Sequence, residues 1–80
     1  MTKEEIFSSL GEVLAVVKPQ LDLSKVTPES RLLEDLGVDS LSMLLLSLGA
    51  ETKFGIRFEA KEPFKTVGEV VNYIKVLTEN

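Results

Sequence analysis

The sequence predicts a small all-α bundle that forms one domain. Its 80 residues leave room for a single modest core. Hydrophobic residues make up 44% of the chain, which is typical of a folded globular domain. These residues recur mostly at helical spacing, and no alternating strand pattern stands out. We therefore expect one domain over residues 1–80: a four-helix bundle with a long loop between the first two helices and a short third helix.

The first helix is expected over Lys3–Lys18. Thr2 is a suitable N-cap, and Glu5 stands at the position that completes a capping box. Pro19 ends the helix because proline has no backbone N–H to donate. Apolar residues at helical spacing supply its inward face: Ile6, Leu10, Val13, Leu14 and Val17.

A long connection follows over residues 20–38 and has no sustained hydrophobic period. Within it, Thr27–Glu29 resembles the start of a single helical turn. A loop of this length in a small domain is usually functional or carries its own packing. Its scattered apolar residues indicate that it packs on the core: Leu21, Leu23, Val26, Leu32, Leu33 and Leu36.

The second helix is expected over Ser40–Phe54, with Asp39 as its N-cap and Gly55 as its C-terminal stop. A third, short helix or turn is expected around Glu59–Glu62. The last helix is expected over Val67–Thr78, capped by Thr66, with Glu69 completing a capping box.

The composition excludes several classes of function. The chain contains no Cys and no His, so it can form neither a disulfide framework nor a Cys- or His-ligated zinc site. A net charge of −4 argues against nucleic acid and anionic membranes as partners. No apolar run reaches the ~20 residues that span a bilayer, and acidic residues near the amino terminus do not fit a signal peptide. We expect a cytoplasmic protein without membrane insertion or a bound metal.

The segment Leu36–Leu41 is the candidate functional site. Ser40 follows a glycine-containing turn at the first turn of a helix, where free N–H groups and the helix dipole favour negative charge. A phosphate ester on Ser40 would lie in a favourable field. From spacing alone, a plain helix cap is the commoner meaning of Asp39-Ser40. A catalytic serine is not expected, because no His is present to activate it.

Three segments resemble the acyl carrier proteins. Leu32–Leu41, which reads LLEDLGVDSL, is similar to the phosphopantetheine attachment motif of that family. Phe54–Ile56 is similar to the end of the family's second helix, and Thr66–Ile74 is similar to its last helix. The resemblance extends over nearly the whole chain and includes its length and acidity. Asp-Ser-Leu alone would be a weak signal, but three segments at these spacings are a strong one.

The resemblance implies a non-catalytic shuttle. Ser40 would carry 4'-phosphopantetheine through a phosphodiester, installed from coenzyme A by a phosphopantetheinyl transferase, and the arm's thiol would hold acyl groups as thioesters. Asp39 would help to bind the metal ion in the transferase complex. Leu41 would contact partner enzymes that transfer or modify the acyl group. The chain is expected to be a monomer.

The second helix departs from the family pattern. Members of the family usually carry acidic residues along its exposed face, where this chain has Ser42 and Leu45. Leucines at helical spacing share one side, which periodicity alone would assign to the core: Leu41, Leu44, Leu45 and Leu48. The family register turns Leu46, Ala50 and Phe54 inward instead, and we follow it. It predicts an exposed leucine stripe, which indicates a partner surface. The alternative is that the long loop packs over part of this stripe.

The unusual second helix indicates a specialised polyketide or lipid pathway. A D-alanyl or other aminoacyl carrier is an alternative within the carriers. An unmodified helical adaptor that binds protein through its leucines is an alternative of another class. The small residues of the second helix (Ser47, Gly49 and Ala50) are expected to allow close helix packing.

Overall fold

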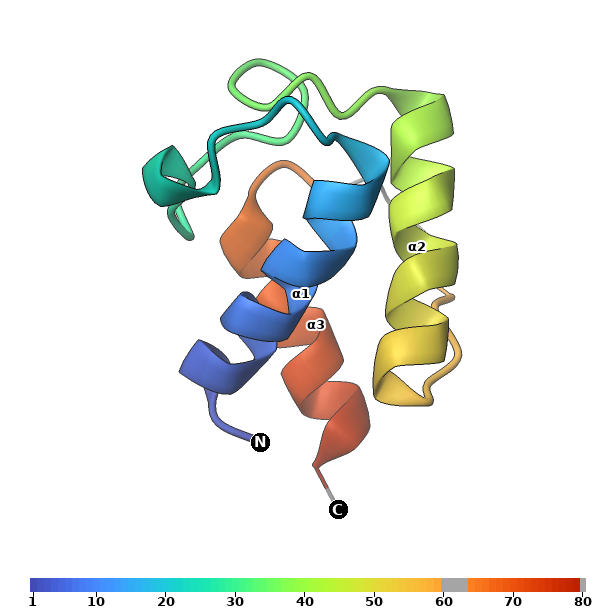
Figure 1. The fold of residues 1–80 in the computed structure, drawn as a ribbon. Helices are drawn as coiled ribbons and strands as arrows, with labels where there is room; N and C mark the ends of the chain where they lie inside the picture. Colours follow the sequence, from blue (N-terminus) through green and yellow to red (C-terminus); the bar gives the residue numbers. More distant parts are fainter. Residues whose placement is uncertain (60–63, 80) are drawn as a thin grey trace.

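The protein is a bundle of α-helices under a long loop (Figure 1). The computed structural model describes residues 1–59 and 64–79. Within these residues the helices are α1 (Lys3–Val17), α2 (Ser40–Phe54) and α3 (Val67–Thr78), with a short 3₁₀ helix, η1 (Leu23–Lys25), in the loop. The all-α prediction is confirmed. The short helix expected around Glu59–Glu62 falls mainly on residues 60–63, which lie outside the described residues.

α1 begins with the expected capping box. The Thr2 amide donates to Glu5 Oε1 at 2.7 Å, and the Glu5 amide donates to Thr2 Oγ1 at 3.1 Å. Two N–H groups at the helix start are thereby satisfied. The helix ends one residue earlier than expected, since Lys18 is its C-cap and donates its amide to Leu14 O.

The capping box expected for α3 is only half formed. Thr66 Oγ1 accepts from the Glu69 amide at 3.3 Å, as a capping side chain should. The Glu69 carboxylate, however, accepts from the amide of Lys65 at 3.0 Å and not from that of Thr66. Glu69 therefore holds the segment before the helix in place.

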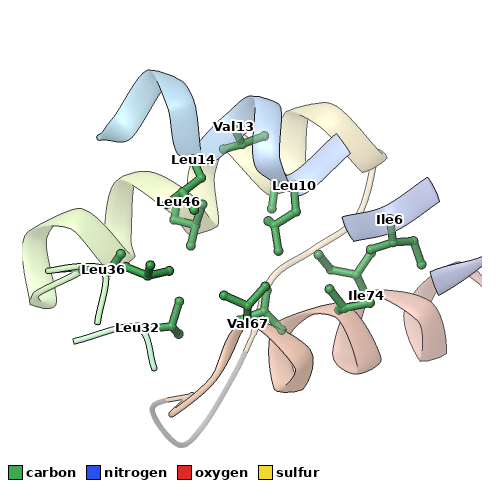
Figure 2. Close-up of a cluster of buried hydrophobic side chains, with 13 residues drawn as sticks. Ile6, Leu10, Val13, Leu14, Leu32, Leu36, Leu46, Val67 and Ile74 are labelled. Atoms are coloured by element: carbon green, nitrogen blue, oxygen red, sulfur yellow. The ribbon is translucent and has the colours of Figure 1, made fainter. Parts of the chain in front are cut away.

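The core lies between α1 and the other two helices, and the loop covers one end of it. α1 packs against both α2 and α3. Figure 2 shows side chains from all three helices and from the loop directed into one cluster. The largest fully buried side chains are Ile6, Leu46, Val70 and Ile74.

The loop is fixed to the segment that leads into α3. Backbone hydrogen bonds join the Leu32 amide to Lys65 O at 2.9 Å and the Gly68 amide to Pro28 O at 2.8 Å. Its predicted packing on the core is confirmed for Leu32 and Leu36, which are buried, and in part for Leu21 and Val26. The prediction is wrong for two of its leucines, Leu23 and Leu33, which are exposed.

Thr27–Glu29 does form a turn, in which the Ser30 amide donates to Thr27 O at 3.0 Å. The helical turn of the loop lies earlier, in η1, where Asp22 Oδ1 caps it by accepting from the Ser24 amide at 3.1 Å. η1 could not be predicted from the sequence, because a helix of three residues has no hydrophobic period to detect.

α1 and α2 approach each other closely at Gly49. A methyl group built at this position would overlap the Val13 side chain. The expected close packing of the small residues in α2 is therefore confirmed at Gly49, while Ala50 lies fully buried in the core. This close contact holds α2 against α1, and the candidate site lies at the start of α2.

Candidate functional site

Ser40 is the first residue of α2 and is exposed. The chain reaches it through Gly37, whose φ of 68° lies in the left-handed region that favours glycine. Between them, Val38 is buried and donates its amide to Leu32 O at 2.7 Å. The serine hydroxyl is thus accessible to another molecule while the backbone just before it is held in place.

Asp39 caps α2. Its Oδ1 accepts from the Ser42 amide at 2.9 Å, and its carbonyl oxygen accepts from the Met43 amide at 2.8 Å. The hydrogen bond from the Ser42 backbone is the largest cause that lowers the pKa of Asp39, and the charge of Lys18 lowers it slightly further. The carboxylate is therefore ionised at neutral pH and exposed beside Ser40.

The first turn of α2 combines two fields of opposite sign. The amides of Ser40 and Leu41 come first in the helix, where no preceding turn supplies a carbonyl, and the helix dipole favours an anion there. The Asp39 carboxylate satisfies the Ser42 amide and adds negative charge. A phosphate ester on the Ser40 hydroxyl would be attracted by the helix start and repelled by the Asp39 carboxylate.

An ion pair shapes the loop ahead of the site. Arg31 donates its backbone amide to Asp35 Oδ2 at 2.7 Å, and Arg31 Nη2 lies 3.2 Å from Asp35 Oδ1. The backbone hydrogen bond from Arg31 is the largest cause that lowers the pKa of Asp35. This pair was not among the residues expected to matter, although opposite charges four residues apart are a recognisable signal in the sequence.

A wide groove adjoins Ser40. Its volume is about 1130 Å³, and it runs between the loop, α2 and the segment that leads into α3. Asp39 and Ser40 lie among its lining residues, together with Met43 and Ser47 of α2 and Phe64 and Thr66 before α3. The groove can accept a flexible chain that starts at Ser40. Sequence reasoning did not predict it, because its walls come from three separate segments.

The leucine stripe of α2 faces solvent. We use this name for Leu41, Leu44, Leu45 and Leu48, whose exposed fractions are 66%, 56%, 47% and 52%. Leu46 and Ala50 are buried on the opposite side, and Met43 and Phe54 are half-buried there. The family register is thus confirmed for this helix. Ser42, which was expected among the outward positions, is buried because it precedes Leu46 by one turn on the same side.

Two further findings concern metals and membranes. In residues 1–59 and 64–79, no three acidic side chains gather where a metal ion could bind. None of the helices in this same part of the chain has the length and apolar character required to cross a bilayer.

Comparison with known proteins gives a consistent result. The sequence model of the family described as "Phosphopantetheine attachment site" matches residues 4–74. The chain is 39% identical over 80 residues to the meromycolate extension acyl carrier protein of Mycolicibacterium smegmatis, a match that covers 98% of this chain and 80% of the relative. It is 43% identical over 76 residues to an acyl carrier protein of Acidothermus cellulolyticus, covering 92% and 89% of the two chains. It is 38% identical over 76 residues to that of Thermotoga maritima, covering 92% and 93%.

Proposed function

The chain belongs to the acyl carrier protein family, and on that basis we propose that Ser40 is the residue to which its phosphopantetheine is attached. The protein is a non-catalytic carrier whose prosthetic group is 4'-phosphopantetheine. When bound, this group supplies a terminal thiol that holds the acyl group as a thioester, and the chain itself contains no Cys. Its partners are a phosphopantetheinyl transferase and enzymes that handle acyl groups.

One observation carries the assignment of Ser40: it is exposed at the first turn of α2, at the edge of the groove. The fit to a phosphopantetheine group is good on three counts. The Ser40 hydroxyl is exposed, so within a transferase it can attack the pyrophosphate of coenzyme A, from which the adenosine bisphosphate leaves. The start of the helix favours the negative charge of the phosphodiester that forms. The groove of about 1130 Å³ can take a flexible arm. Ser42, the neighbouring serine, is buried and cannot be reached in the folded chain.

Asp39 has two roles in this proposal. It caps α2 in the free protein, and it contributes one ligand to the metal ion in the transferase complex. The lowered pKa of its carboxyl supports the second role, since a metal ligand must be deprotonated. The carboxylate keeps one oxygen, Oδ2, outside the hydrogen bond to the Ser42 amide. Capping and metal binding are therefore compatible in one side chain.

We place the carrier in a specialised lipid pathway that extends acyl chains, with polyketide synthesis as the second candidate. Several relatives at 36–39% identity are meromycolate extension carriers, which supports chain extension. The leucine stripe sets this helix apart from one that meets its partners through acidic residues. We propose that the stripe contacts those partner enzymes and that the carrier works as a monomer in the cytoplasm.

The experiment that tests the attachment is intact-mass analysis. The purified apo chain is incubated with coenzyme A, Mg²⁺ and a phosphopantetheinyl transferase, and we expect the mass to rise by one phosphopantetheine. Fragmentation of the peptide that contains Ser40 then locates the group. A chain that gains no mass, or gains it at another serine, would contradict the proposal.

A further inference from the structure

A second groove lies between α1 and α2, away from the one that adjoins Ser40. Its volume is about 570 Å³. Three valines of α1 (Val13, Val16 and Val17) and two residues of α2 (Leu45 and Gly49) form its apolar lining. The groove has no part in holding the phosphopantetheine as described above.

Gly49 lines the groove at the point where the two helices touch, since a methyl group there would overlap Val13. Val16 is 81% exposed at one side of the groove, and Leu45 is 47% exposed at the other. A lone exposed valine needs no explanation, but Val16 shares this groove with Leu45, which also belongs to the exposed leucine stripe.

The charges around this groove cancel. Its polar lining residues are Glu12, Thr52 and Lys53, and Lys53 Nζ lies 3.5 Å from Glu12 Oε2. The chain as a whole carries a net charge of −4, so this neutral area differs from the rest of the molecule. A complementary surface would be apolar and uncharged there, because a charged group would lose its hydration without gaining a partner.

The groove is continuous with the face that acyl-handling enzymes must approach. Leu45 belongs both to the groove and to the leucine stripe, and the stripe starts at Leu41, next to Ser40. Along α2, Leu45 lies roughly 7–8 Å from Ser40 and Gly49 roughly 13–14 Å, at 1.5 Å per residue. An enzyme that covers the stripe while it receives the arm therefore reaches the groove.

We propose that the groove between α1 and α2 receives an apolar side chain from the acyl-handling enzyme that engages the leucine stripe. This inference rests on Ser40 being the attachment site, because that position makes α2 the docking face. In a binding hot spot, an anchor residue usually fills a pocket, and the contacts around that pocket exclude water. The α1 side of the groove would then contribute to recognition, although α1 lies outside the attachment motif.

The test uses Val16, which belongs to α1 and to neither the stripe nor the attachment site. Val16→Glu and Val16→Lys each place a charge in the groove. Val76→Glu is the matched control, since Val76 is also a helical valine, 70% exposed, on α3. The binding partner is a purified condensing enzyme of acyl-chain extension from the same organism. Its affinity for each holo carrier is measured by fluorescence anisotropy.

We expect both Val16 variants to weaken the complex by about tenfold and Val76→Glu to change it less than about twofold. All variants should accept phosphopantetheine as the parent chain does, which shows that the fold and Ser40 are intact. If the parent chain accepts no phosphopantetheine, the proposed function fails. If loading is normal but the Val16 variants bind as tightly as the control, only the inference about the groove fails.

Two other outcomes would also overturn the inference about the groove between α1 and α2. If Glu weakens binding while Lys strengthens it, the contact is ionic and the occupant is not apolar. If sedimentation finds a dimer of the parent chain that Val16→Glu dissociates, the occupant is a second copy of this chain.

Discussion

Ser40 is accessible because a hydroxyl at the first turn of a helix projects from the end of the helix and packs against nothing. The same position removes it from the core, so its side chain should contribute little to stability. Asp39 next to it holds the helix start through the Ser42 amide. At this site the residue that caps the helix and the proposed attachment residue are neighbours, and each can be changed separately.

Ser40→Ala should abolish loading and leave the fold intact. Substitutions of exposed residues away from special features usually change the free energy of unfolding by less than ~0.5 kcal/mol. The measurement is intact mass after incubation with the transferase, together with a denaturant unfolding curve. Ser42→Ala is the matched control and should still be loaded, because Ser42 is buried on the inward side of α2. Loading of the Ser40→Ala chain would contradict the assignment.

Asp39→Asn separates the cap from the charge. Asparagine caps a helix about as well as aspartate, so stability at neutral pH should be nearly retained. Loading should become at least about tenfold slower, since a neutral amide is a poor substitute for a carboxylate ligand. Unchanged loading rates at ordinary Mg²⁺ concentrations would mean that Asp39 is only a cap.

The same variant should also be less sensitive to acid. The folded-state pKa of Asp39 is lowered, so its stabilising contribution is fully present above the unfolded pKa of about 3.9 and is lost as pH falls through the folded pKa. The pKa values of the carboxyls of Glu5, Asp35 and Glu79 are lowered as well, so the parent chain should lose stability in that acidic range. Unfolding midpoints measured from pH 7 down to pH 2 should fall less steeply for Asp39→Asn. An identical slope would contradict this role.

α2 has two apolar sides, and hydrophobicity alone does not distinguish them. The outward side carries the larger side chains, while the inward side contains Ser42, Leu46 and Ala50. Periodicity alone favours the leucine side, which is wrong, because the pattern records which side is more hydrophobic and not which side faces another helix. The small inward residues fit because α1 comes so close at Gly49.

Leu45→Glu should leave stability nearly unchanged and weaken binding to partner enzymes. Leu45 is half exposed in the free chain, so the change in free energy of unfolding should stay near ~0.5 kcal/mol. Binding of the parent carrier should depend only weakly on salt, since little of the contact would be charge pairing. Leu46→Ala is the contrasting variant: Leu46 is 1% exposed and its truncation should cost ~2–5 kcal/mol. A severely destabilised Leu45→Glu chain would mean that the stripe is part of the core.

Two glycines in helices should respond oppositely to alanine. Gly11 of α1 has open space where a Cβ would be added, so Gly11→Ala should stabilise the protein by ~0.5–1 kcal/mol. A Cβ at Gly49 would overlap Val13, so Gly49→Ala should destabilise it by ~1–3 kcal/mol despite the better helix propensity of alanine. Urea unfolding measures both, and adding Val13→Ala to Gly49→Ala should recover part of the loss. Equal effects of the two substitutions would show that the helices are not in close contact.

Over the whole molecule, features encoded locally could be predicted from the sequence. The bounds of α2 and α3 followed from Asp39, Gly55 and Thr66, because caps act within one turn. The exposure of Ser40 at the start of α2 also followed from the local sequence, and its role as attachment site stays a proposal. The groove beside Ser40 could not be predicted, since Ser47, Phe64 and Thr66 come together only in the folded chain. The Glu69 side chain was assigned to the wrong amide for a similar reason: both candidate donors are close in sequence, and only the path of the loop decides between them.

The bonds that fix the loop also set an order of events while the protein is being made. The backbone of Pro28–Leu32, just ahead of Ser40, is held by Lys65, Val67 and Gly68, which lie far along the chain. On a ribosome, Ser40 is therefore synthesised before the residues that anchor the loop leading to it, and the interval is on the order of seconds. A nascent chain that stops short of Lys65 has its serine but not the anchored loop. The carrier should thus become a good substrate for its transferase only after the start of α3 has been synthesised and the loop is anchored.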